Sequence, residues 1–263
     1  MNSHQKWLSV PRPKPDAALR VFCFPFAGGA AHAYFAWTKR LTADVELCLV
    51  ELPGRGRRIA EEPVPQLNSL VSEITAVLLP LMAEKPFALY GHSMGALILF
   101  EVARQLRRSG GPTPIGLLPS AGRAPQFRKA DRRRHELPQD EFVKILKLLN
   151  GTPPEVFDDD ELLNMVIPAL RADFSVCDTY EYQSEPPLDC PIIAFGGEGD
   201  EAVHKELIAG WSEQTTRRFE QHECSGDHFF IRDPDGEFLE KLDQTLGQLV
   251  IDLGAASGAQ ASR

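Results

Sequence analysis

The sequence has no long uninterrupted hydrophobic run, although 43% of its 263 residues are hydrophobic. No stretch approaches the roughly 20 apolar residues that a helix needs to cross a bilayer, so we expect no membrane-spanning segment. Residues 1–16 are polar and proline-rich, and they lack the apolar stretch of a secretory signal peptide. These absences predict a cytoplasmic protein that does not associate with membranes.

Positive charge is also scarce, since 28 Lys and Arg face 37 Asp and Glu, for a net charge of −9. A nucleic-acid-binding domain normally presents a basic face, so we expect no nucleic-acid partner. The five cysteines are odd in number and form no C-x-x-C pair, which argues against a disulfide framework or a metal site. Cys23 and Cys48 lie in apolar runs, where a free thiol behaves as a small buried hydrophobe.

Short apolar runs alternate with helical patterns along most of the chain. Apolar residues recur at i, i+3, i+4 and i+7 over 67–81, which predicts a helix, and a second helix is expected from about 96 to 108. Alternating strands and helices are typical of an α/β fold with a mostly parallel sheet covered by helices on both faces. The predicted strands are 21–24, 45–50, 87–90, 115–118, 192–195 and, more weakly, 219–223.

This alternation breaks over residues 137–184, where only helical patterns occur, near 142–149, from about 158, and over 169–179. The segment is too long for a simple crossover, so we interpret it as a helical lid inserted over the edge of the sheet. Extra helices packed on one flank remain the alternative. The core would then comprise 17–136 and 185–253, and residues 1–16 and 254–263, which lack periodicity, would be flexible tails.

Gly91-His92-Ser93-Met94-Gly95 lies between a predicted strand and a predicted helix. A G-x-S-x-G pattern at such a turn is typical of a nucleophile elbow, because its glycines allow a tight turn that raises the serine hydroxyl above the sheet. The start of the following helix favours a developing negative charge there. We expect the side chain of His92 to point away from Ser93 and to have a packing role.

A serine hydroxyl needs a base, and the base needs a third group to orient it. Among the histidines after the serine, His228 follows the last predicted strand in a glycine-containing loop, which favours it as the base. His204 is the main alternative. His222 lies within a strand pattern and His135 in a basic run, so we interpret both as structural or solvated.

The orienting acid is expected in the glycine-rich loop that follows the strand 192–195. Open α/β sheets gather their sites at the carboxyl ends of their strands, and Asp200 lies there. Glu198 and Glu201 are close in sequence and stay open as alternatives.

An oxyanion hole requires two backbone N–H groups aimed at the tetrahedral oxygen. Met94, which follows the nucleophile, should supply one, and the loop 25–29 after the first strand should supply the other. The glycines of that loop also fit a phosphate loop. Because G-x-G-x-x-G and a Walker lysine are both absent, we expect no nucleotide site.

With these motifs the chain resembles the stand-alone type II thioesterases that accompany polyketide synthases and nonribosomal peptide synthetases. The resemblance extends from about residue 22 to 230, and its most specific runs are Leu-Pro-Gly-Arg-Gly and Leu-Arg-Ala-Asp-Phe. The matching segments are Phe24-Pro25-Phe26-Ala27-Gly28-Gly29, Glu51-Leu52-Pro53-Gly54-Arg55-Gly56-Arg57-Arg58, Gly91-His92-Ser93-Met94-Gly95, Leu170-Arg171-Ala172-Asp173-Phe174 and Gly226-Asp227-His228.

The resemblance implies an α/β-hydrolase fold and a catalytic triad of Ser93, Asp200 and His228. It also implies an oxyanion hole formed by the N–H groups of Ala27 and Met94 and a flexible lid over 137–184. The implied substrate is an acyl thioester on the phosphopantetheine arm of an acyl or peptidyl carrier protein, and the implied role is removal of stray acyl groups. No metal or organic cofactor would be needed, and the family is typically monomeric.

Two other functions remain in competition. A small-ester or acyl-CoA esterase would share the triad, but the chain lacks an HGGG-type oxyanion motif. A non-catalytic binding module of the same fold would not need the complete Ser, Asp and His set. Carrier proteins are usually acidic, so the basic run 128–134, with Arg55, Arg57 and Arg58, is a candidate docking surface, unless it is simply solvated.

Overall fold

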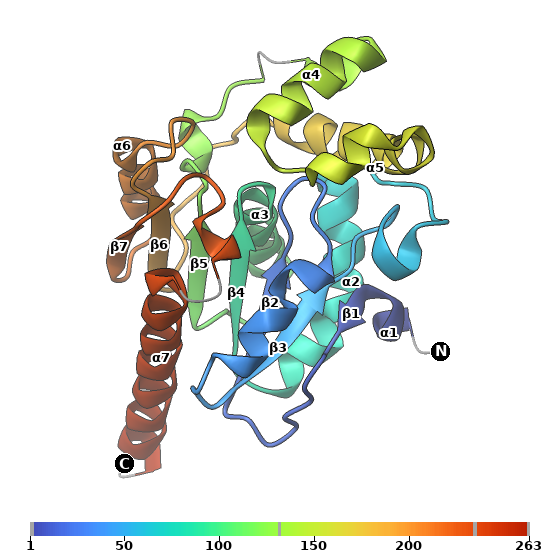
Figure 1. Cartoon of the computed structure of the whole chain (residues 1–263). Coiled ribbons are helices and arrows are strands. Elements are labelled where there is room, and N and C mark those ends of the chain that lie inside the picture. Colours follow the sequence, from blue (N-terminus) through green and yellow to red (C-terminus); the bar gives the residue numbers. More distant parts are fainter. Residues whose placement is uncertain (1–2, 131–132, 234–235, 262–263) are drawn as a thin grey trace.

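The computed structural model describes residues 3–130, 133–233 and 236–261. Its centre is a seven-stranded sheet in the order β1-β3-β2-β4-β5-β6-β7 (Figure 1). All neighbouring strands are parallel except β1 and β3, which are antiparallel. The predicted α/β-hydrolase-like fold is therefore confirmed. The strands are β1 (Leu8–Ser9), β2 (Leu19–Phe24), β3 (Val45–Val50), β4 (Phe87–His92), β5 (Gly116–Ser120), β6 (Ile192–Gly197) and β7 (Phe219–Cys224).

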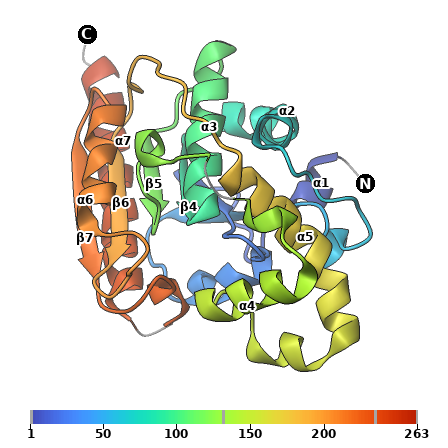
Figure 2. The same ribbon diagram turned by 90° about the horizontal axis from the view of Figure 1, so that it is seen from above.

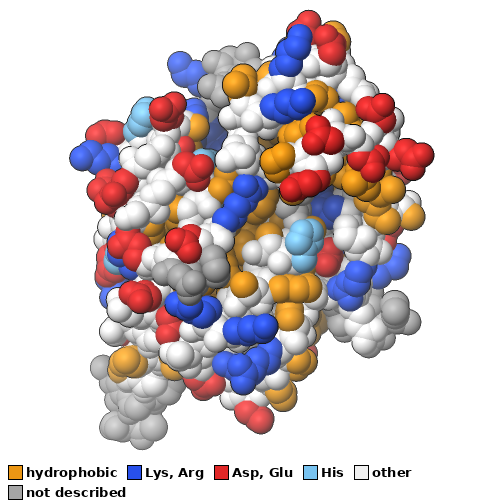
Figure 3. Space-filling view, viewed as in Figure 1, with side chains coloured by type: hydrophobic (Ala, Val, Ile, Leu, Met, Phe, Trp, Pro, Cys, Tyr) orange, Lys and Arg blue, Asp and Glu red, His pale blue; other side chains and the backbone are white. Residues whose placement is uncertain are grey.

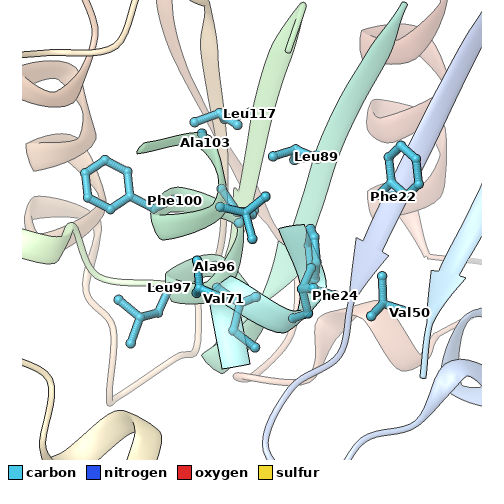
Figure 4. Close-up of a cluster of buried hydrophobic side chains, with 14 of the residues drawn as sticks. Phe22, Phe24, Val50, Val71, Leu89, Ala96, Leu97, Phe100, Ala103 and Leu117 are labelled. Atoms are coloured by element: carbon cyan, nitrogen blue, oxygen red, sulfur yellow. The ribbon is translucent and has the colours of Figure 1, made fainter. Parts of the chain in front are cut away.

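Both faces of the central strands are buried, which is why these strands appear in the sequence as continuous apolar runs. In β2, Phe22 and Phe24 pack into the core on one face of the sheet, and Val21 and Cys23 pack into the core on the other. The first core is built with the helices α2 (Leu67–Glu84) and α3 (Met94–Arg108) (Figure 4).

The second core is formed with the 3₁₀ helix η1 (Ala31–Lys39) and the long C-terminal helix α7 (Glu237–Ala261) (Figure 1). The sheet thus has helices on both faces, as predicted. The remaining helical elements are short: α1 (Ser3–Trp7), α6 (Lys205–Ala209), η2 (Gly56–Arg58), η3 (Pro125–Phe127), η4 (Arg134–Glu136), η5 (Pro154–Asp158), η6 (Gly210–Gln214) and η7 (Phe230–Arg232).

By length and composition alone, α2 is apolar enough to cross a membrane, with a mean hydropathy of 1.3 over 18 residues. In the fold, Leu70, Ile74 and Leu78 on one face of this helix are buried in the first core. A core helix that packs on a sheet can have the same apolar composition, so the packing of α2 on the sheet explains its hydropathy.

Two helices, α4 (Gln139–Leu149) and α5 (Asp160–Asp178), lie over the carboxyl ends of the strands (Figures 1 and 2). The prediction of separate helices from about 158 and over 169–179 is wrong, because α5 is continuous and passes through Pro168. It begins at Asp159, whose carboxylate accepts hydrogen bonds from the N–H groups of Glu161 and Leu162.

The helices α4 and α5 share a small core of their own, which includes Phe142, Leu146 and Phe174. Val176 in the last turn of α5 and Tyr180 just beyond it instead join the first core, between the sheet and the helices α2 and α3. The segment 137–184 therefore covers the strand ends with one part and packs on the flank with another, so both interpretations of the sequence hold in part. Its division from the core at these boundaries stays a prediction.

Both terminal segments are more regular than expected. The expectation of a flexible tail over 1–16 is wrong for residues 3–9, because α1 and β1 form there and β1 pairs with β3. Trp7 is buried, and the guanidinium of Arg58 lies 3.8 Å from its ring centroid. At the other end, α7 extends through 254–261, where the sequence predicts a flexible tail.

Candidate active site

Ser93 lies between the last residue of β4 and the first residue of α3. Its backbone has φ 56° and ψ −104°, a region that residues other than glycine rarely adopt and that costs about 1–3 kcal/mol. The glycines on either side make this turn possible. A Cβ on Gly91 would lie 2.1 Å from the carbonyl oxygen of Gly95, and a Cβ on Gly95 would lie 2.2 Å from that of Phe24. The predicted elbow is therefore present.

The three predicted triad residues are brought together from segments far apart in the chain. The Nε2 of His228 lies 2.9 Å from the Oγ of Ser93, and its Nδ1 lies 2.6 Å from Oδ2 of Asp200. Asp200 is buried, and its other carboxylate oxygen accepts hydrogen bonds from the N–H groups of Ala202 and Val203. Nδ1 of the imidazole can therefore donate to Asp200, while Nε2 can accept the serine proton.

Burial alone would raise the pKa of Asp200, but hydrogen bonds from His228, Ala202 and Val203 outweigh it and lower the pKa below its usual value. The carboxylate therefore stays ionised. A charged, immobile acid is the group needed to orient and stabilise an imidazolium.

The rival residues lie elsewhere. His204 is exposed at the start of α6, and His222 in β7 stacks on Phe195. His135 lies in η4, beside Asp178 of α5. Glu198 and Glu201 are exposed, and neither makes a hydrogen bond to an imidazole in the described part of the chain. Among the predicted alternatives, the geometry brings only His228 and Asp200 to the serine.

The two predicted oxyanion donors border the same cavity as Ser93. In the described part of the chain, the N–H groups of Ala27 and Met94 have no hydrogen-bond partner, so both are available to a ligand. Met94 opens α3, so its N–H is one of the groups that a helix leaves unsatisfied. The neighbouring loop residue Gly28 does have a partner, the carboxylate of Asp173.

His92 contributes more than the packing role predicted for it. It is completely buried, its Nε2 donates to the backbone carbonyl of His228 at 2.9 Å, and its Nδ1 lies 2.9 Å from the hydroxyl of Ser120. Burial, together with the nearby His228, lowers the pKa of His92 well below its usual value, so the ring is neutral. The sequence signal was the position of His92 beside the nucleophile, but its partner lies 136 residues away.

A cavity of about 850 Å³ lies between Ser93 and the helices α4 and α5. On the helix side its lining is mainly apolar, with Leu146 from α4 and Leu170 and Phe174 from α5. Arg128 also borders it, and its Nη2 lies 3.4 Å from the backbone carbonyl oxygen of Ser93. The Nε of Arg128 is buried without a partner among the described residues, and burial lowers the pKa of this guanidinium. The sequence included Arg128 only in the basic run 128–134, as part of a candidate docking surface, and did not predict its place beside Ser93.

Several side chains of the candidate basic docking surface are buried or paired within the protein. Arg55 and Arg58 are buried and bind Asp173 and Glu61, which leaves Arg57 exposed. In the run 128–134, residues 131–132 lie outside the described residues, and Arg134 binds Asp178. Arg55, Arg58 and Arg134 are therefore not available to the candidate docking surface, and a role for the exposed Arg57, Lys129 and Arg133 stays a prediction.

A hydroxyl hydrogen-bonded to an imidazole, a buried carboxylate behind that imidazole and two available N–H groups, all at the carboxyl edge of a parallel sheet, are the features of a serine hydrolase with the α/β-hydrolase fold. The chain belongs to the thioesterase domain family, which it matches over residues 19–246. It is accordingly a hydrolase that acts on thioesters.

Named relatives support this assignment. The chain is 42% identical over 241 residues to the gramicidin S biosynthesis protein GrsT of Aneurinibacillus migulanus, covering 92% of this chain and 94% of that protein. It is 36% identical over 240 residues to the thioesterase PikA5 of Streptomyces venezuelae, covering 91% and 85%.

Solved structures agree with the sequence relatives. The thioesterase RedJ from the prodiginine pathway of Streptomyces coelicolor superposes with a TM-score of 0.82 at 35% identity, covering 92% of this chain and 95% of that chain. The type II thioesterase BorB from the borrelidin cluster gives a TM-score of 0.80 at 34% identity, with 91% and 97% covered. The predicted resemblance to type II thioesterases is confirmed.

Proposed function

We propose that this protein removes aberrant or stalled acyl groups from the phosphopantetheine arms of carrier proteins in a polyketide or nonribosomal peptide pathway. The observation that carries the proposal is the placement of His228 between Ser93 and Asp200, beneath a cavity of about 850 Å³. The relatives named for gramicidin S, prodiginine and borrelidin biosynthesis support the pathway class.

In the proposed reaction, Nε2 of His228 takes the proton of the Ser93 hydroxyl as its oxygen attacks the thioester carbonyl. The N–H groups of Ala27 and Met94 hold the oxygen of the tetrahedral intermediate. The intermediate collapses to an acyl-serine and expels the pantetheine thiol, which receives the proton from His228. Water, activated by the same imidazole, then releases the carboxylic acid and restores the hydroxyl.

A thiolate leaves easily, so most of the catalytic demand falls on positioning and on the oxyanion donors. The apolar cavity wall formed by Leu146, Leu170 and Phe174 suits the acyl chain. Movement of α4 and neighbouring residues of the segment 137–184, as a lid, would admit the arm. We further propose that the protein acts in the cytoplasm as a monomer, and its five free cysteines are compatible with a reducing compartment.

The test is a panel of carrier proteins loaded with acyl groups of varied chain length, with release of the free acid followed by mass spectrometry. We expect a higher kcat/KM on acyl-carriers than on p-nitrophenyl esters of the same acids. Ser93→Ala should be inactive on every substrate and should not react with a fluorophosphonate probe. A wild-type preference for the simple esters would reject carrier proteins as the substrate class.

A further inference from the structure

Asp173, in the C-terminal third of α5, is a buried carboxylate that does not contact the triad. Its Oδ2 accepts a hydrogen bond of 2.7 Å from the backbone N–H of Gly28, in the loop that carries Ala27. Both of its oxygens are also bound by the guanidinium of Arg55, from the loop after β3. The same guanidinium donates to the carbonyl oxygen of Gly29 at 3.3 Å. One ion pair therefore joins three segments of the chain.

The loop held by this pair is a tight turn. The N–H of Gly29 donates to the carbonyl of Phe26 at 2.8 Å, and Gly28 has φ +78°. This is the geometry of a type II turn with Ala27 and Gly28 at its centre, and it requires the positive φ that glycine tolerates. In a type II turn the central peptide is flipped relative to type I, and an acceptor for the Gly28 N–H selects that orientation. Asp173 is this acceptor.

The helix α5 also contacts the turn sterically. A Cβ added to Gly28 would lie only 2.6 Å from Cδ2 of Leu170, one turn before Asp173 on the same helix. The turn is thus pressed against α5 on one side and held by the carboxylate through its central peptide. Its position depends on the helix above the cavity as well as on β2 below.

The positive partner is needed for electrostatic reasons. A bare carboxylate so close to the oxyanion hole would repel the developing negative charge, and burying it unpaired would be strongly unfavourable. The bidentate contact with Arg55, itself buried, makes the assembly neutral overall. The turn is then held without placing net negative charge beside the reacting oxygen.

We propose that Asp173, with Arg55, is a positioning residue that holds the Ala27 N–H where the tetrahedral oxygen forms, so that helix α5 is part of the oxyanion hole. This inference rests on the proposed function only in assigning Ala27 as a donor. It divides the segment 137–184 into a fixed part, around Asp173, and the residues before α5, which are left to move.

The first test compares Asp173→Asn with Glu101→Gln. Glu101 is a matched control, because it is a buried carboxylate of α3 that binds Arg104 and the hydroxyl of Tyr180, away from the cavity. With an acyl-pantetheine thioester we expect Asp173→Asn to lower kcat about 10- to 100-fold with KM changed less than 3-fold, a smaller effect than complete removal of an oxyanion donor. Glu101→Gln should lose thermal stability while keeping the wild-type kcat.

A transition-state analogue separates this role from general damage. A trifluoromethyl ketone adds to Ser93 and places its oxygen in the oxyanion hole, whereas an unreactive amide of the same chain fills the cavity only. Asp173→Asn should weaken binding of the ketone by about the same factor as kcat/KM falls and leave binding of the amide unchanged. Equal weakening of both ligands would overturn the proposal. If the wild type binds the ketone but hydrolyses no thioester, the proposed substrate fails and the positioning role survives.

The double variant Asp173→Leu with Arg55→Met guards against misfolding. Replacing both partners of a buried ion pair by apolar residues is far less destabilising than removing one. We expect the double variant to regain thermal stability relative to Asp173→Asn without regaining kcat. Recovery of kcat together with stability would mean that the pair only supports the fold. The milder Arg55→Lys should keep the charge, lose the bidentate contact and reduce kcat by about 3- to 10-fold.

Discussion

The imidazole of His92 donates a hydrogen bond to the backbone carbonyl of His228, so the residue before the nucleophile holds the loop that carries the base. The other ring nitrogen of His92 accepts from the hydroxyl of Ser120, at the end of β5. This places a neutral histidine between the elbow and the loop after β7. The backbone that carries the His228 imidazole is therefore held by a side chain that does not line the cavity.

We expect His92→Phe to slow acylation of Ser93. Phenylalanine keeps the ring but leaves the carbonyl of His228 and the hydroxyl of Ser120 without their partner, which should cost about 1–3 kcal/mol of stability. Labelling by a fluorophosphonate and kcat/KM should both fall about 10-fold. His222→Phe is the control, since His222 in β7 stacks on Phe195 away from the elbow. Equal losses in the two variants would contradict the role assigned to His92.

The same histidine predicts a pH dependence of stability. The pKa of His92 is lowered well below its usual value in the folded state, whereas the unfolded chain takes up a proton near pH 6.5. The unfolded state therefore binds more protons below that pH, so stability is complete above about pH 6.5 and decreases as the pH falls. Asp200, whose pKa is also lowered, adds a decrease of the same sign below about pH 4.

Urea unfolding of the wild type and of His92→Phe at pH 7.5 and pH 5.5 checks this dependence. The wild type should lose stability between the two values, and the variant should lose clearly less. His222 is common to both proteins and contributes equally to both. If the two proteins show the same change between pH 7.5 and pH 5.5, His92 does not cause it.

The strained backbone of Ser93 predicts that glycine at this position gives a more stable protein than alanine. With φ 56°, a residue with a Cβ is unfavourable there, so Ser93→Gly should be more stable than Ser93→Ala by about 1 kcal/mol. At most sites the order is reversed, because glycine gains entropy in the unfolded chain. Thermal denaturation of the two inactive variants measures the difference. A more stable alanine variant would mean that the turn carries no strain at this residue.

The predictable and the unpredictable parts of this molecule differ in a physical way. The central strands are buried on both faces and appear as apolar runs, and the elbow is marked by a local pattern that the close approach of Gly95 to Phe24 requires. By contrast, the contact of Asp173 with Gly28 spans 145 residues, and no local pattern pairs a carboxylate with one particular N–H.

The short strand β1 and the continuous helix α5 escaped prediction for other physical reasons. The two-residue strand β1 is too short to show any alternation, and Trp7 before it is buried by tertiary contacts alone. Helical patterns from about 158 and over 169–179 were expected as separate helices, yet α5 continues through Pro168, because Leu170 and Phe174 pack into the same small core as Leu163 and Ile167. Tertiary packing here outweighs the local preference of proline.

The close approach at the elbow gives a stability test with an internal control. A methyl group at Gly95 would overlap the backbone of β2, which cannot move without disturbing the sheet, so Gly95→Ala should lose more than about 3 kcal/mol or fail to fold. Gly247, within helix α7, has no heavy atom within 4 Å of its added Cβ. There the same substitution should be neutral or stabilise by up to about 1 kcal/mol. Equal urea midpoints for the two variants would contradict this account of the elbow.

The last prediction concerns how a carrier protein would meet this surface. Hydrophobic side chains are exposed on α4 and α5, including Leu148 of α4 and Met165 of α5, with charged residues among them (Figure 3). Of the basic run, Lys129 borders the cavity and is exposed, and Arg133 is exposed and pairs only with its neighbour Glu136 in the described part of the chain. Exposed charges at a rim mainly change the rate of association.

We therefore expect the double variant Lys129→Glu with Arg133→Glu to lower kcat/KM on an acyl-carrier about 5- to 20-fold at low salt, with the difference shrinking as salt is added. Hydrolysis of the same acyl group from N-acetylcysteamine, which has no protein surface, should change less than 2-fold. The double variant Arg12→Glu with Lys39→Glu, two exposed residues that do not line the cavity, is the control for the same change of net charge. If the double variant affects both substrates equally, or neither, these two residues do not guide the carrier.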